Sequence, residues 1–574
     1  MYIYKSSLSN TEFLENTSDL AMAYKNQLDD ICSAFRGTPI ETLKYSKLAL
    51  FDNTGDREIY QTDYFKRRER LVAFSIRSWL YGEKADIDEL CDILWAICDE
   101  YTWALPAHIG GITRNSDVSR YCIDLFACET AQAISETLSI CEDYIPELIK
   151  KRCIDEIMKR VIMSFETGDT EKYRFGWEKA DNNWAAVCGG SIGIVAMYLV
   201  EDNARMNKIL SRAIDSANRF FNKCNNDGSW EEGVYYWMYA MQYYVALDEM
   251  CREKLGKSIV PDFDKMKKTA SLPSAVCFSD GNRITFSDCG EVHLYFGILA
   301  RLAKRYDVSI PDKRYYSELI DSCARFCGAV RNIAWFDDTV ISENTAQNDV
   351  FFPDGQWAIM HSDSTTVAIK GGNNAEMHNH NDVGSYMYIC NGHIIADDLG
   401  APVYDADYFG KKRYENLNTS SRGHNVPVVN GYFQHEGKEF FADRFQENKN
   451  GIEVSFAKAY DKKSELQSLV RYMNLDKKSG TVTISDEFEF KNLQNSVKER
   501  IVTKYAVAVL DNTAYVKDRE KDIAKIEFLC NGEIRIIQDS YIANNTDKKQ
   551  NVNIIEFKTN MDNSGNVSYK IIAV

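Results

Sequence analysis

The sequence predicts an α+β protein of at least two domains, with helical hairpins over residues 1–340 and an antiparallel β-sandwich over residues 341–574. Three observations support this fold class. A chain of 574 residues is too long for a single hydrophobic core. Up to about residue 330, apolar residues recur at helical spacing. Beyond about residue 350, short stretches alternate polar and apolar residues, as half-buried strands do.

The segment "IDLFACETAQAISETLSI" shows the helical pattern, because Ala127, Ala131, Ile134 and Leu138 fall on one face. The same spacing recurs in "RRERLVAFSIRSWLYG", "PELIKKRCIDEIMKRVIMSF" and "MNKILSRAIDSANRFFNKC". Many helices follow one another without intervening strands. This succession favours stacked antiparallel hairpins over a single bundle.

The C-terminal part contains alternating runs such as "WAIMHSDSTTVAIKGG", "SYMYICNGHIIADD" and "GTVTISDEFEF". Between two of these runs stands Asn391-Gly392, a strong signal for a two-residue β-hairpin turn. The regular succession of strands predicts a sandwich. The change of pattern near "FDDTVISENTAQNDVFFPDG" marks the expected domain boundary.

Composition restricts the classes of partner. The net charge is -17, with 85 acidic and 68 basic residues, so a broad basic footprint for nucleic acid is missing. The sequence has no run of about 18 apolar residues and no signal-peptide layout at its start. The 16 cysteines are scattered singly, which is typical of buried thiols in a reducing compartment. We therefore expect a cytoplasmic protein with no membrane partner.

The stretch "AEMHNHNDVGSY" concentrates polar chemistry in a chain with 8 histidines. On an extended segment His378, His380 and Asp382 would face the same side. Two such imidazoles can hold a divalent metal, or one can transfer protons while the other binds the metal. Asp397, Asp398 and His424 follow as further acceptors. The competing interpretation is a polar loop that satisfies its own hydrogen bonds.

A shared metal site imposes a condition on this stretch. A two-residue turn at Asn391-Gly392 pairs Cys390 with His393 and, counting outward, Tyr386 with Asp397. Asp397 would then lie six residues along from His380, roughly 20 Å on a straight strand. The segment must therefore fold back, and Gly384 is a plausible pivot.

Three predicted helix entrances also carry polar and aromatic residues. "WEKADNNWAAVCGGSIG" places Asn182, Asn183 and Trp184 before an apolar helix, where one asparagine can act as N-cap. "NNDGSWEEGVYYWMYAMQYY" offers Trp230, two glutamates and several tyrosines, and "EYTWALPAHIGGI" offers His108. Aromatic residues at helical spacing are more often core than catalytic.

Taken in order, "NNWAAVCGG", "DGSWEEGVYYWMY", "HNHNDVGSYMYICNGHIIADDLG" and "TSSRGHNVPVVNG" resemble the heparinase II/III type of polysaccharide lyases, which include alginate and glycosaminoglycan lyases. The similarity extends from about residue 90 to about residue 435. It implies an incomplete (α/α) toroid joined to an antiparallel β-sandwich. It also implies cleavage of a uronate-containing glycan by β-elimination, which leaves an unsaturated uronate end.

The resemblance implies specific roles for residues. Asn183 would neutralise the substrate carboxylate, with Asn182 as the alternative. Tyr236 and His378 would act in proton transfer, and Tyr235 or Tyr239 could replace Tyr236 if the match shifts. A tyrosine base needs nearby positive charge or hydrogen bonds, because its unperturbed pKa is about 10.

By the same resemblance, His380, Asp397 and His424 match the ligands of a structural Zn2+, and no organic cofactor is expected. The candidate substrate-binding residues are Asn182, His108, Trp184, Trp230, Glu232 and Arg422. The expected partner is an acidic oligosaccharide or polysaccharide, with homo-oligomer formation left open.

Three other functions are alternatives to β-elimination. A toroid glycoside hydrolase would use a carboxylate pair, for which Glu231 and Glu232 are the candidates. A carbohydrate-binding protein without turnover is the second alternative, and metal-dependent hydrolysis the third. Hydrolysis by two carboxylates gives no reason for the histidine pair or for the Asn-Asn-Trp entrance.

Overall fold

The computed structural model describes residues 2–574 apart from 110–116, 169–174, 291, 317, 342–346, 405–407, 409, 411, 450 and 544–547. The chain forms two compact units. The helical unit comprises Met1–Cys224, Tyr236–Ala270 and His293–Ile341. The β unit comprises Ser342–Val574 together with two earlier stretches, Asn225–Tyr235 and Ser271–Val292. These stretches were not part of the predicted β-sandwich domain.

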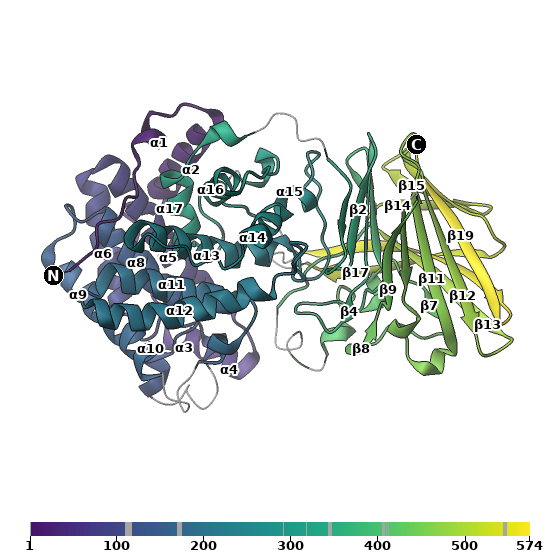
Figure 1. Cartoon of the computed structure of the whole chain (residues 1–574), viewed down its shortest axis with the longest axis horizontal. Coiled ribbons are helices and arrows are strands. Elements are labelled where there is room, and N and C mark those ends of the chain that lie inside the picture. Colours follow the sequence, from purple (N-terminus) through teal and green to yellow (C-terminus); the bar gives the residue numbers. More distant parts are fainter. Residues whose placement is uncertain are drawn as a thin grey trace. The chain divides into compact units, whose positions relative to one another are not determined.

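The helical unit consists of helices that pack against their neighbours in sequence, as in the pairs α5 with α6, α11 with α12 and α16 with α17 (Figure 1). Its helices are α1 (Thr11–Glu15), α2 (Asp19–Phe35), α3 (Tyr45–Leu48), α4 (Leu50–Thr54), α5 (Glu58–Tyr81), α6 (Lys84–Cys98), α8 (Leu125–Ile140), α9 (Glu147–Ile157), α10 (Met163–Thr167), α11 (Asn183–Leu199), α12 (Asn203–Lys223), α13 (Gly233–Leu255), α14 (Phe263–Ala270), α16 (Phe296–Tyr306) and α17 (Phe326–Ala334). α13 begins in the β unit and continues into the helical unit. None of the helices described is long and apolar enough to cross a membrane.

α11 is buried along almost its whole length, and its glycines explain how its neighbours approach. A Cβ at Gly189 would lie 2.6 Å from the Ala213 carbonyl oxygen of α12, and one at Gly190 would lie 2.8 Å from Cβ of Tyr243 on α13. Both distances are shorter than any ordinary contact. Glycine at these two positions therefore lets three helices pack backbone to backbone.

In the described part of the β unit there are α15 (Leu272–Val276) and four antiparallel sheets. The strand orders are β1-β2-β3-β5-β6, β14-β15-β16-β19-β12-β11-β10-β9, β17-β18-β13-β7 and β4-β8. The strands are β1 (Val350–Phe352), β2 (Trp357–His361), β3 (Thr365–Lys370), β4 (Asn373–Asn374), β5 (Tyr386–Cys390), β6 (His393–Ala396), β7 (Val428–Val429), β8 (Gly437–Phe441), β9 (Arg444–Asn448), β10 (Gly451–Ser455), β11 (Leu466–Leu475), β12 (Val482–Phe490), β13 (Asn495–Thr503), β14 (Ala506–Leu510), β15 (Thr513–Asp518), β16 (Lys521–Phe528), β17 (Glu533–Ile542), β18 (Lys549–Met561) and β19 (Ser564–Ala573).

One apolar core joins the three larger sheets. Ile369 of β3, Ile484 of β12 and Ile555 of β18 belong to the same buried cluster. The Tyr386 hydroxyl of β5 also lies 3.1 Å from the Tyr569 hydroxyl of β19. The predicted fold class is thus confirmed: helical hairpins of an α/α toroid precede an antiparallel β-sandwich.

The hairpin of β5 and β6 follows the predicted turn and then departs from the predicted register. Asn391 and Gly392 have φ values of 49° and 80°, as the favoured two-residue turn requires. Cys390 pairs with His393 as predicted. The register then shifts, so that Tyr388 pairs with Ala396. β6 therefore has one extra residue, a β-bulge.

Candidate functional site

An aspartate from outside the histidine segment organises the site in the β unit. Asp288 lies in the stretch Ser271–Val292, and its side chain is completely buried. Its Oδ2 accepts a hydrogen bond from His378 Nδ1 at 2.7 Å, and its Oδ1 accepts one from His380 Nε2 at 3.0 Å. One carboxylate therefore fixes the orientation of both imidazoles. The sequence reasoning missed Asp288, because nothing local distinguishes "FSDCG" from an ordinary turn.

Other donors converge on the same carboxylate. The Tyr408 hydroxyl donates to Asp288 Oδ2, and Arg413 Nη2 lies 3.5 Å from that oxygen. The Arg413 guanidinium also lies over the Tyr408 ring, 4.3 Å from its centroid. Burial alone would raise the pKa of Asp288, but the hydrogen bonds and positive charges of His378 and His380 outweigh it, so this pKa lies far below its usual range. Asp288 is therefore ionised.

The segment that carries the histidines is a series of turns and not the extended strand that was assumed. His378 has a φ of 56°, a left-handed conformation that is uncommon for a residue with a side chain. Gly384 has a φ of 85°, and a Cβ there would lie 2.7 Å from the Phe456 ring. The predicted fold-back of this segment, with Gly384 as its pivot, is confirmed.

The electrostatic surroundings of His378 favour its charged form. Burial would lower its pKa, but the hydrogen bond to Asp288 and the negative charges of Glu232 and Asp288 outweigh burial and raise it. Glu232 is fully buried in the same unit, and burial raises its pKa to about 7. The nearby positive charge of His378 limits that rise. His378 thus lies in the field of two acidic residues.

Four buried residues of the β unit form a group suited to a metal ion. They are His380, Asp382, Asp398 and His424, and one ligand atom from each lies within 4.8 Å of all the others. Two imidazole nitrogens and two carboxylate oxygens are a normal ligand set for a tetrahedral Zn2+ site. Several other divalent metals accept the same donors.

Hydrogen bonds outside the group leave the ligand atoms oriented towards its centre. Lys370 Nζ binds Asp382 Oδ1 at 2.8 Å, and the Gly400 N–H binds Asp398 Oδ1 at 3.1 Å. Nε2 of His424 donates to a backbone carbonyl at 2.7 Å, as Nε2 of His380 does to Asp288. Among the described residues, the remaining atoms have no hydrogen-bond partner outside the group: His380 Nδ1, Asp382 Oδ2, Asp398 Oδ2 and His424 Nδ1. Within the group, His424 Nδ1 lies 3.2 Å from Asp398 Oδ2. Such outer partners fix histidine tautomers in metal sites, so the residues fit a metal.

Asp398, and not the predicted Asp397, belongs to this group. Asp397 instead forms an ion pair with Lys504 at 2.7 Å. The bulge in β6 explains the difference, because an extra residue exchanges the sides on which successive side chains lie. Continuing the observed register places Asp398 opposite Tyr386, where a regular hairpin would have placed Asp397.

The sandwich core holds the loops of the site in position. Arg471 of β11 is fully buried, and its Nη1 donates to the carbonyl oxygens of Gly384 and Asn425, each at 2.7 Å. Its charge is balanced by Asp486, which accepts from Nε at 2.8 Å. Arg471 therefore links the pivot of the histidine segment to the residue that follows His424.

Two other predicted substrate-binding residues lie in the β unit. Trp230 is buried, and it interacts with Glu232. Arg422 is exposed, and its Nη2 donates to the carbonyl of Glu415 at 2.6 Å within its own loop. Glu232 therefore interacts both with Trp230 and with the charge of His378, whereas Arg422 has no such interaction with His378 among the described residues.

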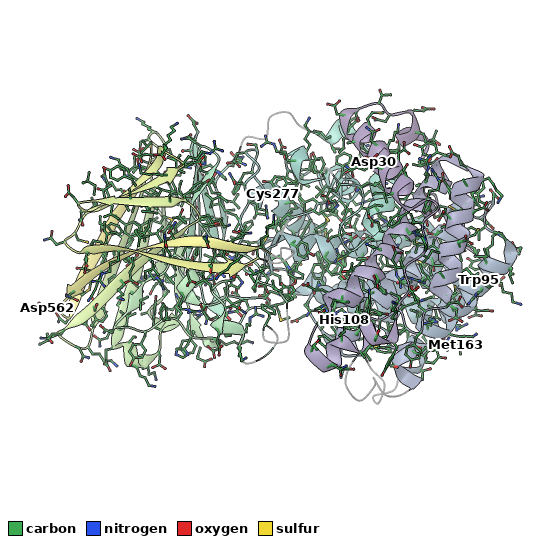
Figure 2. All side chains as sticks on the ribbon, turned by 180° about the vertical axis from the view of Figure 1, so that it is seen from behind. Asp30, Trp95, His108, Met163, Cys277 and Asp562 are labelled. Carbon is green, nitrogen blue, oxygen red and sulfur yellow. The ribbon has the colours of Figure 1, made fainter. Side chains whose placement is uncertain are left out.

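The helical unit brings together a second set of predicted residues. The Asn182 side chain caps α11 by accepting from the Trp184 N–H at 3.2 Å, and Asn183 is buried in the first turn. The Trp184 ring meets the His108 ring edge to face at 4.8 Å. His108 (Figure 2) is held by Asp124, with Nδ1 2.7 Å from Oδ2. An aspartate-oriented histidine therefore lies at the entrance of α11.

Tyr236 and Tyr239 differ in their surroundings on α13. The Tyr239 hydroxyl donates to Glu129 Oε1 at 2.6 Å, and the Arg325 guanidinium lies 3.8 Å from its ring centroid. Burial raises the pKa of Tyr239 well above its usual value, and the charge of Glu129 raises it further. Tyr239 is thus engaged in the core of the helical unit. Tyr236, in the first turn of α13, is also buried.

The C-terminal part of the chain resembles a known protein family. Residues 344–570 match the family model described as "Heparinase II/III-like, C-terminal". This match contains the histidine segment, Asp398 and His424. The resemblance inferred from the sequence motifs is confirmed for this part of the chain. No curated protein matches the sequence.

Solved structures of polysaccharide lyases share the fold over nearly the whole chain. Heparinase III is 13% identical, covers 100% of this chain and 87% of its own, and has a TM-score of 0.66. A mutant heparan sulfate lyase from Pedobacter heparinus is 13% identical, with 99% and 86% covered and a TM-score of 0.61. Paenibacillus xanthan lyase is 10% identical, with 97% and 58% covered and a TM-score of 0.56. At these identities the likeness concerns the fold.

Proposed function

We propose that the protein is a lyase that cleaves a uronate-containing glycan by β-elimination. The observation that carries this proposal is the arrangement of His378, which Asp288 orients through Nδ1 beside the buried Glu232. The match of residues 344–570 to the heparinase II/III-like family supports it. The lyase names of the structures that share the fold agree with this chemistry.

The reaction removes the proton on C5 of the uronate, breaks the C4–O bond and leaves a C4–C5 double bond. The C5 proton is weakly acidic while the neighbouring carboxylate is charged, so this charge must be neutralised. We assign that role to the Asn183 amide. Tyr236 accepts the C5 proton and returns a proton to the leaving oxygen.

His378 contributes positive charge to this chemistry. Because its Nδ1 is hydrogen-bonded to an ionised aspartate, it is the imidazolium that the surroundings favour. An imidazolium stabilises a tyrosine phenolate and the enolate-like charge that develops on the carboxylate. His108, which is oriented by Asp124, is assigned to substrate binding at the entrance of α11 together with Trp184.

We assign a structural Zn2+ to His380, Asp382, Asp398 and His424. The metal would tie the turn that carries His378 to the loops of Asp398 and His424. The substrate class is a uronate glycan, and its acidity requires local positive charge because the protein as a whole is acidic. The cytoplasmic location expected from the sequence would favour short imported oligosaccharides.

Glu232 favours one alternative. A buried carboxyl group whose pKa is raised to about 7 is suited to act as the general acid of a glycoside hydrolase. Products separate the two reactions. Elimination yields an unsaturated uronate that absorbs ultraviolet light, whereas hydrolysis yields a saturated product one water heavier.

The test is to incubate the protein with heparan, chondroitin, hyaluronan, xanthan and alginate oligosaccharides and to follow ultraviolet absorbance and product mass. We expect an unsaturated product from at least one of them. Saturated products alone would establish hydrolysis. An absence of cleavage across the panel, with a folded and metal-loaded protein, would contradict both enzymatic functions.

A further inference from the structure

A cavity of about 300 Å³ lies within the helical unit. It is lined by Tyr198 at the end of α11, by the last turns of α13 and by Arg331 and Trp335 at the end of α17. Asn183 begins α11, and the fifteen residues from there to Tyr198 span roughly 22 Å of helix. The cavity is therefore separate from the entrance of α11.

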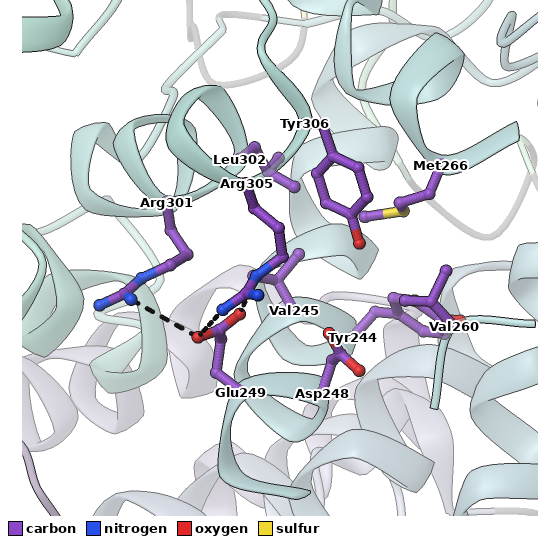
Figure 3. Close-up of a pocket in the computed structure, with 10 residues that line it drawn as sticks. All are labelled: Tyr244, Val245, Asp248, Glu249, Val260, Met266, Arg301, Leu302, Arg305 and Tyr306. Carbon is purple, nitrogen blue, oxygen red and sulfur yellow. Dashed lines mark hydrogen bonds and ion pairs between the residues drawn. The ribbon is translucent and has the colours of Figure 1, made fainter. Parts of the chain in front are cut away.

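Arg301 of α16 enters this cavity with spare hydrogen-bonding capacity. The neighbouring Glu249 is already bound by Arg305, with contacts of 2.6 and 2.8 Å, while Arg301 Nη1 lies 3.5 Å away (Figure 3). Within the described part of the chain, Arg301 makes no hydrogen bond. Its side chain is 35% exposed, so solutes can reach the guanidinium.

Arg331 contributes a second positive charge to the same wall. Two of its nitrogens hold Glu136 at 2.7 and 3.1 Å. The Trp335 ring lies 4.7 Å from the Arg301 guanidinium and 5.0 Å from that of Arg331. The two arginines are thus positioned by one aromatic ring.

The acidic residues of the cavity are already engaged. Glu253 accepts hydrogen bonds from the Tyr4 hydroxyl at 3.0 Å and from the Ser7 N–H at 2.9 Å. Burial lowers the pKa of Arg301, and the charges of Arg305 and Arg331 lower it further, against the opposing effect of Glu249. An anion bound beside Arg301 would relieve this repulsion.

We propose that this cavity binds a small organic carboxylate of the size of a single uronic acid through Arg301, with Arg331 adding positive charge to the same wall. A planar guanidinium matches a carboxylate with two parallel hydrogen bonds. The cavity volume is at the lower end of the range for small-molecule sites, which suits a monosaccharide. This site does not depend on the proposed elimination reaction.

Titration calorimetry with glucuronate, glucose, succinate and sulfate tests the proposal. We expect glucuronate to bind at this site in the unaltered protein and equally in His378→Ala. Arg301→Gln should weaken binding about tenfold or more, because a charge-assisted hydrogen-bond pair is lost. Arg314→Gln, at an exposed arginine of the same unit, should leave the affinity unchanged.

Arg301→Lys keeps the positive charge but loses the planar guanidinium that donates two parallel hydrogen bonds. It should therefore bind glucuronate more weakly than the unaltered protein does. This variant tests the proposal also in the case that Arg301→Gln fails to fold. The proposal is overturned if glucose binds as tightly as glucuronate, or if both Arg301 variants retain full affinity. Preferential binding of succinate or sulfate would also overturn the assignment to a uronic acid, as would the absence of any binding.

Discussion

Asp288 and His378 are joined by a 2.7 Å hydrogen bond although ninety positions separate them in the sequence. The Asp288 N–H also donates to the His378 carbonyl at 3.2 Å. Asp288 thus binds His378 twice, through its side chain to the imidazole and through its backbone N–H to the backbone carbonyl. This double contact holds a histidine with left-handed backbone dihedrals in one orientation.

Replacing Asp288 by asparagine should reduce turnover by about 10²–10³-fold, the range for loss of one group that stabilises charge in the transition state. The amide cannot supply the negative charge that favours the His378 imidazolium. Steady-state kinetics on the cleaved oligosaccharide measure the effect. Asp280→Asn, at an exposed aspartate of the same stretch, is the matched control. Equal activity of the two variants would exclude Asp288 as the positioning residue.

The sequence predicted the parts of the site that depend on local patterns. The helix entrance at Asn182, the turn at Asn391-Gly392 and the fold-back at Gly384 follow from short-range preferences of particular residues. Asp288 could not be predicted, because its role depends on a contact between distant stretches. The family resemblance indicated Asp397, and the structure has Asp398 in its place; the bulge that moves the register leaves no signature in an alternating sequence.

Asp398 and Asp397 provide a direct test of the metal group, since they are neighbours with different partners. Asp398→Asn should lower bound zinc and the melting temperature, because it removes one of four converging ligands. Asp397→Asn should keep the metal, since its partner is Lys504. Metal content by mass spectrometry and thermal unfolding measure both effects. Loss of zinc in the Asp397 variant alone would contradict the ligand assignment.

Substitutions of Tyr236 and Tyr239 should have different effects, the first on catalysis and the second on stability. Tyr236→Phe should abolish product formation, because the assigned role needs the hydroxyl, and unfolding measurements on this variant show whether it remains folded. Tyr239→Phe removes the hydrogen bond to Glu129 and should cost about 1–3 kcal/mol of unfolding free energy. Kinetics and denaturant unfolding of both variants test this division, which fails if Tyr236→Phe retains full activity.

Arg471 should be among the most sensitive positions of the β unit. Arg471→Met leaves Asp486 buried without its partner and removes donors from two loop carbonyls. Breaking a buried pair in this way typically costs about 3–5 kcal/mol. Arg444→Met, at a half-exposed ion pair with Glu453, should cost less than about 1 kcal/mol. Denaturant unfolding compares the two, and equal losses would contradict the role of the buried network.

Glu232 should make stability depend on pH. Its folded pKa of about 7 exceeds the usual glutamate value of 4.5, so the folded state binds the proton more tightly than the unfolded state. This contribution to stability is complete below about pH 4.5 and is lost as pH rises through about 7. The difference of about 2.5 units corresponds to about 3 kcal/mol.

Glu232→Gln should therefore raise the melting temperature at pH 8 relative to the unaltered protein and change it little at pH 4.5. Glu231→Gln, at the adjacent half-buried position, serves as the matched control. Glu129 and Glu376 also have pKa values raised to about 7 by burial, so part of the pH dependence must remain in the Glu232 variant. A pH profile identical to that of the unaltered protein would show that Glu232 is ionised in the folded state.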